Sequence, residues 1–164
     1  LSVALIGFAT TLGSAGGLIS AVLADRVSKK IGVGRTIVLT IPLGGPMLVV
    51  LAFCQPGNDL LNALVIGGGF FAAAASGTLY NINQVSLRQA LTPPEMSGRM
   101  NATMRWFVWG TIPIGALLGG IIGTNLRLRE ALIIGGIGGS FAFVPLLFGP
   151  VWGIKEMPTA VAEK

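Results

Sequence analysis

Residues that could do chemistry are few in this sequence of 164 residues. It has no histidine and a single cysteine, Cys54, so a metal site of the usual His and Cys type is not expected. All six acidic residues lie at or beyond the ends of long apolar stretches, where no carboxylate pair is shielded for acid–base work. Four serines within these stretches have no partner base: Ser14, Ser20, Ser76 and Ser140. We therefore expect no enzyme, no catalytic residue, no cofactor and no metal.

The most polar part of any apolar stretch is residues 76–84. Positions 77, 81, 84 and 88 share one face of a helix, and the adjacent face holds positions 76, 80 and 83. Polar groups inside a membrane are costly unless they face water or a partner. We interpret four of them as a candidate substrate path: Tyr80, Asn81, Asn83 and Gln84. The alternative is that the amides only bond neighbouring helices.

Arg105 is the strongest single candidate for contact with a substrate. It follows Arg99 by six positions, which places it roughly 9 Å deeper along a helix. A charge at the centre of a bilayer costs about 2.5–3.5 kcal/mol on insertion scales. Arg105 either lines a cavity for an anionic or zwitterionic substrate or extends its side chain to the inner headgroups.

Composition favours a membrane protein as the scaffold for these residues. The chain is 52% hydrophobic and only 10% charged, where about 25% charged is usual for a soluble domain. Its mean hydropathy is +0.80. The net charge of +5 does not indicate nucleic-acid binding, because the cations lie between apolar runs without interleaved aromatic residues.

Five apolar stretches are long enough to cross a bilayer at about 20 residues each. They predict an all-α integral membrane protein with five transmembrane helices at about residues 1–24, 36–53, 60–86, 99–124 and 131–152, followed by a polar tail at 155–164. Pro42 and Pro46 predict an interruption of the second span. Thr92 and Glu95 predict a capping box at the start of the fourth helix, with Pro93 at its first position.

Glycines four residues apart predict close packing between helices. Such residues are Gly13 and Gly17 in the first span and Gly115, Gly119 and Gly123 in the fourth. Packing is the preferred interpretation over contact with a substrate.

The cations predict how the chain is oriented in the membrane. Nine fall on one side: Arg26, Lys29, Lys30, Arg35, Arg88, Arg99, Arg105, Lys155 and Lys164. Arg127 and Arg129 fall on the other. The positive-inside rule then places the first residue outside and the C-terminus in the cytoplasm.

Two stretches resemble the major facilitator superfamily. Residues 21–32, AVLADRVSKKIG, resemble its cytoplasmic-loop motif, Gly-x-Leu-Ala-Asp-Arg-x-Gly-Arg/Lys-Arg/Lys, with Ala21 and Ser28 in place of the two glycines. Residues 86–120 resemble the region from helix ten to helix eleven of bacterial exporters of the enterobactin-exporter-like and macrolide-efflux-like kind. On this resemblance the five spans are helices eight to twelve, an incomplete C-terminal six-helix bundle. Helix seven and the N-terminal half are then expected upstream as the partner of this domain.

The resemblance implies a mechanism and a location. Asp25, Arg26, Lys29 and Lys30 would form a latch that holds the inward side closed, although the same residues also suit a simple span end. The expected function is secondary active transport in the bacterial inner membrane. It would be proton-coupled export of a small amphipathic compound, such as a drug or siderophore, by alternating access. An uptake permease of the same fold and a non-transporting assembly partner are the alternatives.

Overall fold

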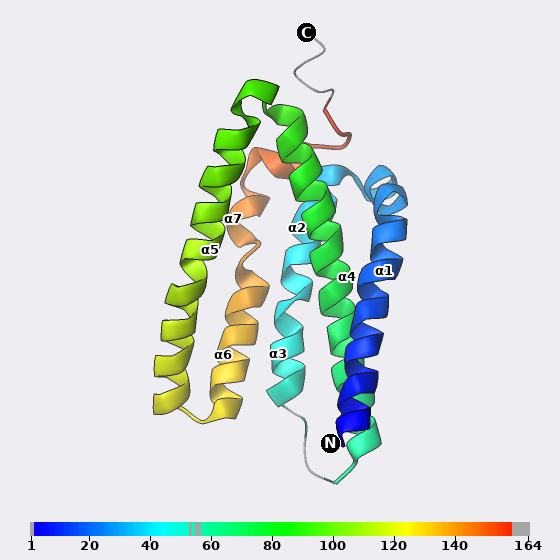
Figure 1. Ribbon diagram of the computed structural model, residues 1–164, viewed down its shortest axis with the longest axis vertical. Coiled ribbons are helices and arrows are strands. Elements are labelled where there is room, and N and C mark those ends of the chain that lie inside the picture. Colours follow the sequence, from blue (N-terminus) through cyan, green and yellow to red (C-terminus); the bar gives the residue numbers. More distant parts are fainter. Residues whose placement is uncertain (1, 53, 55–56, 159–164) are drawn as a thin grey trace.

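The computed structural model describes residues 2–52, 54 and 57–158, and these form helices without any strand. Five helical segments within them are long and apolar enough to cross a membrane. They run up and down as one bundle, with α1 and α4 side by side and α5 at its edge (Figure 1). The prediction of an all-α protein with five membrane-spanning helices is confirmed.

The first span continues well past the predicted residue 24. Helix α1 (Val3–Ile31) begins at Ser2, whose hydroxyl accepts a hydrogen bond from the Leu5 backbone N–H at 3.4 Å. Because no breaker precedes Gly32, the helix runs through the charged motif, and Lys29 and Lys30 lie in its last turn. Cations there interact favourably with the helix dipole. Gly32 ends the helix with φ 101°, a conformation that glycine adopts readily.

The second span is broken, as its prolines predict. It consists of α2 (Val33–Thr40), a 3-10 turn η1 (Ile41–Leu43) and α3 (Gly45–Ala52). Pro42 lies in the 3-10 turn. Proline lacks the N–H that an α-helix would use at this point, so the turn tightens there. The predicted end at residue 53 lies outside the described residues.

Helix α4 (Asp59–Leu91) packs along the length of α1. Its first turn is capped by Asn58, whose side chain accepts a hydrogen bond from the Leu61 N–H at 3.3 Å. A Cβ added at Gly13 would lie 2.8 Å from Phe70 Cβ, and one added at Gly16 would lie 2.9 Å from Phe71 Cα. Gly16, which the four-residue pattern did not include, therefore marks the closest approach of α1 to the backbone of α4. At Gly17 the nearest atom to an added Cβ is Thr78 Oγ1, at 3.4 Å.

The capping box predicted between Thr92 and Glu95 is wrong. The Thr92 hydroxyl donates a hydrogen bond to the Arg88 carbonyl at 2.7 Å, so Thr92 closes α4 instead of opening the next helix. Helix α5 (Pro94–Asn125) begins one residue later than expected, with Pro93 as its N-cap and no side-chain cap. Two consecutive prolines leave Thr92 in an extended conformation, from which it reaches back to the preceding turn.

Helix α5 packs loosely, since none of its residues is buried. Its exposed large apolar side chains are Met96, Met104, Trp106, Phe107, Val108, Trp109, Ile112, Ile114, Leu117, Leu118 and Ile121. A Cβ added at Gly115, Gly119 or Gly123 would meet no atom within 4 Å. Their role in helix packing therefore stays a prediction that no contact in the described structure tests.

The fifth span is more broken than predicted for 131–152, and its elements lie within 128–153. It comprises α6 (Leu128–Phe141), α7 (Val144–Leu147) and the 3-10 turn η2 (Pro150–Gly153). Pro150 lies in the first turn of η2, where its fixed φ suits a tight start.

Residues 151–157 lie against the start of α2, and we call them the C-terminal strap. The backbone N–H groups of Val33 and Gly34 donate to the carbonyls of Lys155 and Ile154, at 3.2 and 2.9 Å. A small hydrophobic core joins the strap to the bundle: Val33, Ile37 and Leu87 are buried, with Tyr80, Val151 and Ile154 packed against them. The strap thus supplies acceptors to two of the donors that a helix N-terminus leaves unpaired.

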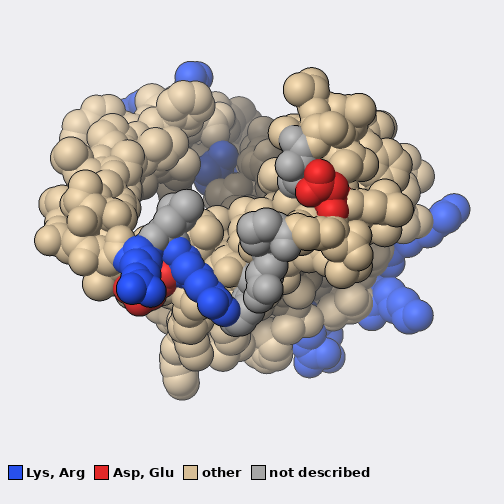
Figure 2. Space-filling model, turned by 90° about the horizontal axis from the view of Figure 1, so that it is seen from below, with Lys and Arg blue, Asp and Glu red and all other residues tan. Residues whose placement is uncertain are grey.

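Charged residues gather at the two ends of the bundle. The end of α1, the start of α2, the α4–α5 turn and the strap lie together at one end, and the α5–α6 turn lies at the other with the N-terminus (Figure 1). From below, charged side chains form small patches on a surface made mostly of other residues (Figure 2). Most of the described cations therefore lie at the opposite end of the bundle from Arg127 and Arg129, as predicted. Lys164 lies outside the described residues.

Candidate functional site

A cavity of about 280 Å³ lies between α4 and α5, and we call it the α4–α5 pocket. Its lining residues are Tyr80, Asn81, Gln84, Val85, Arg88, Met104, Arg105, Val108 and Trp109. Four of the five residues predicted for the substrate path thus line one space, and they come from two helices.

The two helices bring Tyr80 and Arg105 to the same depth. Tyr80 lies eleven residues before Leu91, where α4 ends, and Arg105 lies eleven residues after Pro94, where α5 begins. At 1.5 Å per residue both lie roughly 16 Å from the α4–α5 turn. The helices run antiparallel from that turn (Figure 1), so residues at equal distance from it lie at a similar level along the bundle.

Asn83 does not belong to this pocket. It is only 2% exposed, and its side-chain oxygen accepts a hydrogen bond from the Ser28 hydroxyl of α1 at 2.6 Å. Its amide nitrogen donates to the Leu79 carbonyl at 2.8 Å. Of the two roles left open for the polar residues of this span, Asn83 therefore shows helix-to-helix bonding, and no contact with the α4–α5 pocket.

The pocket is positively charged. Arg88 and Arg105 both line it, and none of the nine lining residues is acidic. Within the described part of the chain, neither guanidinium has a hydrogen bond or an ion pair, and Arg88 Nε is buried without a partner. Buried donors are nearly always paired, so this nitrogen indicates an acceptor that the described residues do not supply.

Arg88 and Trp109 were not among the predicted site residues, although the spacing held a signal for both. Arg88 shares the helical face of Asn81 and Gln84, and Trp109 lies four residues after Arg105, which places it on the same face of α5.

The four residues predicted as a latch lie at the exposed end of α1. Lys29 Nζ and Asp25 Oδ2 form an ion pair at 2.7 Å, with side chains 76% and 74% exposed. Arg26 and Lys30 are also exposed. Among these four residues, the contact that the described structure shows is this Lys29–Asp25 pair within α1, so the role of the four residues as a latch between helices stays a prediction.

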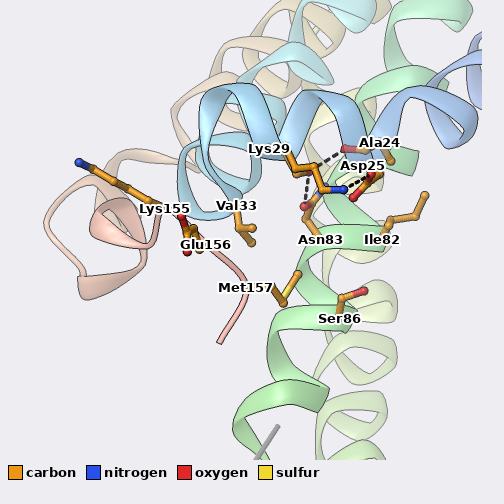
Figure 3. Close-up of a pocket in the computed structure, with 11 residues that line it drawn as sticks. Ala24, Asp25, Lys29, Val33, Ile82, Asn83, Ser86, Lys155, Glu156 and Met157 are labelled. Atoms are coloured by element: carbon orange, nitrogen blue, oxygen red, sulfur yellow. Dashed lines mark hydrogen bonds and ion pairs between the residues drawn. The ribbon is translucent and has the colours of Figure 1, made fainter. Parts of the chain in front are cut away.

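A second cavity, of about 450 Å³, lies between this end of α1, α4 and the C-terminal strap (Figure 3). Asp25, Lys29 and Asn83 lie on one side of it and Glu156 and Met157 on the other, while the Lys155 side chain points away from them. Both signs of charge line this space, so it has no clear preference for a charged ligand.

A comparison with protein families decides the identity of the chain. The family model of the Major Facilitator Superfamily matches residues 1–161. The chain belongs to the Major Facilitator Superfamily. It matches no curated protein and no solved structure. The match makes this a multi-pass membrane protein of a secondary-transporter family, and the five helices fit part of that family's fold.

Proposed function

We propose that the protein exports a small amphipathic compound by alternating access, with the α4–α5 pocket as part of the substrate path. The observation that carries the proposal is the convergence of Tyr80, Asn81, Gln84 and Arg105 on one cavity. Neutral hydrogen-bonding groups and a cation meet Trp109 and Val108 there, so the lining suits a ligand with polar and apolar parts.

Proton coupling is part of the proposal. The described acidic residues lie in the first turn of a helix, in the last two turns of α1 or in the strap: Asp59, Glu95, Glu130, Asp25 and Glu156. We therefore expect the carboxylate that titrates during transport in the N-terminal half of the protein. That half is also the partner we propose for α5, and the absence of buried residues on α5 supports this. Replacing each membrane-embedded acid of that half by its amide tests the coupling, which an unaltered pH dependence of transport in every variant would contradict.

The orientation follows the positive-inside rule. The end of the bundle that carries the α4–α5 turn and the strap would face the cytoplasm of a bacterial cell, and the N-terminus of the described chain would lie outside. Labelling of single cysteines placed at Arg99 and at Arg127, each in a protein whose Cys54 is replaced by serine, with a membrane-impermeant reagent tests this. We expect only the second to react in intact cells.

The transport assay measures accumulation of a fluorescent amphipathic dye in cells that express the full-length protein. Export predicts lower accumulation than in control cells, and an uncoupler should abolish the difference. Uptake by a permease of the same fold would give the opposite sign.

Arg105→Leu tests the pocket itself. We expect it to abolish the export that Arg99→Leu, on the same helix but outside the pocket, leaves in place. If Arg105→Leu leaves transport unchanged, Arg105 has no role in the substrate path.

A further inference from the structure

We propose that Arg88 and Arg105 together bind an oxyanion, a carboxylate or phosphate group, in the α4–α5 pocket. The inference deepens the proposed function by naming the charge of the ligand, and it rests on that function only where the ligand is a transported solute.

The charge of the pocket is the first support. Two cations from different helices share a lining without an acidic residue, so the positive potential of this space favours an anion. The described structure offers neither guanidinium an acceptor, and Arg88 Nε is already removed from solvent. Each guanidinium presents five N–H donors in a planar fork that matches the oxygens of a carboxylate or phosphate.

The rest of the lining defines the shape of the ligand. Tyr80, Asn81 and Gln84 supply neutral donors and acceptors beside the cations. Met104, Val108 and Trp109 supply the apolar wall, on which an attached hydrocarbon or ring would lie. A volume of about 280 Å³ suits an anionic group with a small apolar part.

The position of the arginines allows two sources for the same anion. Residues 60–87 of α4 and residues 106–125 of α5 carry no charge, so Arg88 and Arg105 each border the uncharged run of their helix. The 20 uncharged residues of α5 span roughly 30 Å, the thickness of the hydrocarbon core. The anion therefore comes either from a solute that enters the pocket or from the phosphate of an anionic lipid headgroup.

The experiment measures the unfolding midpoint of the full-length protein in phosphatidylcholine nanodiscs. In one arm benzoate is added at constant ionic strength, with neutral benzamide as the matched compound. In the other arm phosphatidylglycerol replaces part of the phosphatidylcholine. We expect at least one anion to raise the midpoint by about 2–4 °C, and benzamide to leave it unchanged.

The variants assign the effect to the two arginines. Arg88→Gln/Arg105→Gln should remove the shift, whereas Arg99→Gln, on the same face of the membrane but outside the pocket, should keep it. Arg88→Lys/Arg105→Lys retains both charges without the planar fork and should show a smaller shift. This variant also serves if the glutamine variant does not fold.

A shift with benzoate assigns the site to a solute, and a shift with phosphatidylglycerol alone assigns it to a lipid headgroup; both support the proposal. No shift in either arm, equal shifts with benzoate and benzamide, or an undiminished shift in the lysine variant would overturn it. Failure of the transport proposal is distinguishable, because Arg105→Leu would then leave dye accumulation unchanged while the anion shift of the unsubstituted protein persisted.

Discussion

The contact at Gly16 makes the packing of α1 on α4 testable by a single methyl group. A Cβ on Gly16 would lie 2.9 Å from Phe71 Cα and 3.0 Å from its carbonyl carbon, and closer still to its carbonyl oxygen. These are backbone atoms in the middle of a helix, so no change of rotamer relieves the overlap. Gly16→Ala must therefore push the two helices apart.

The size of the effect follows from ordinary contact distances. Carbon atoms pack best at about 3.5–4.0 Å, so the helices must separate by about 0.6–1.1 Å at this point. Overpacking of this kind costs about 1–3 kcal/mol of unfolding free energy. Alanine is favoured over glycine inside a helix by roughly 0.5–1 kcal/mol, which offsets part of that cost. We expect a net loss of about 1 kcal/mol.

The assay is unfolding of the full-length protein in mixed micelles of a mild detergent and increasing SDS, followed by circular dichroism. Gly7→Ala is the matched control, since it lies in the same helix and its added Cβ meets no atom within 4 Å. We expect Gly7→Ala to unfold at the same SDS fraction as the unsubstituted protein or a higher one. Equal stability of Gly16→Ala and Gly7→Ala would refute the close approach of the helices.

Three further predictions use the same protein. A double-mutant cycle of Ser28→Ala and Asn83→Ala should give a coupling in unfolding free energy of about 0.6 kcal/mol, and at most about 1.7 kcal/mol, as found for hydrogen bonds between membrane helices. A coupling of zero would contradict the 2.6 Å bond. Gly34→Ala should lower the SDS fraction at which the protein unfolds, because its Cβ would overlap the Val151 carbonyl. Gly153→Ala, whose added Cβ meets no atom within 4 Å, should not lower it. An equal response of both variants would refute the contact between the strap and α2. Asp25→Asn should change the free energy of unfolding by no more than about 0.5 kcal/mol, because the ion pair of Asp25 with Lys29 is exposed. If Asp25 acts as a latch, the same variant should slow dye export, and normal export would contradict that role.

Spacing in the sequence predicted the five spans and grouped several of the residues that line the α4–α5 pocket. Runs of about 20 apolar residues fix where helices cross a membrane, and helical periodicity placed Asn81 and Gln84 on the face that lines the α4–α5 pocket. Periodicity does not say which neighbour a face meets. Asn83 was therefore grouped with Asn81 and Gln84, although it points to α1 and bonds Ser28.

The misses come from interactions between residues far apart in sequence or from competition between local signals. Thr92 suited a helix start, but the two prolines after it favour an extended backbone, and its hydroxyl bonds the helix behind it. Gly16 lies outside the four-residue pattern of Gly13 and Gly17, yet of these three glycines it has the tightest contact with α4, because the crossing of α1 and α4 sets which glycine faces the Phe71 backbone. The strap pairs residue 155 with residue 33, a pairing that no local pattern encodes.

The strap has a consequence for how the protein is made. The ribosome synthesises a chain from its N-terminus, so Val33 and Gly34 emerge about 120 residues before Ile154 and Lys155, whose carbonyls accept their N–H groups. At about 5–20 residues per second, this delay is roughly 6–24 s. During that time the first turn of α2 depends on water or other acceptors. A ribosome that stalls before residue 154 leaves the start of α2 without these two acceptors, so a segment translated about 120 residues later completes the first turn of this helix.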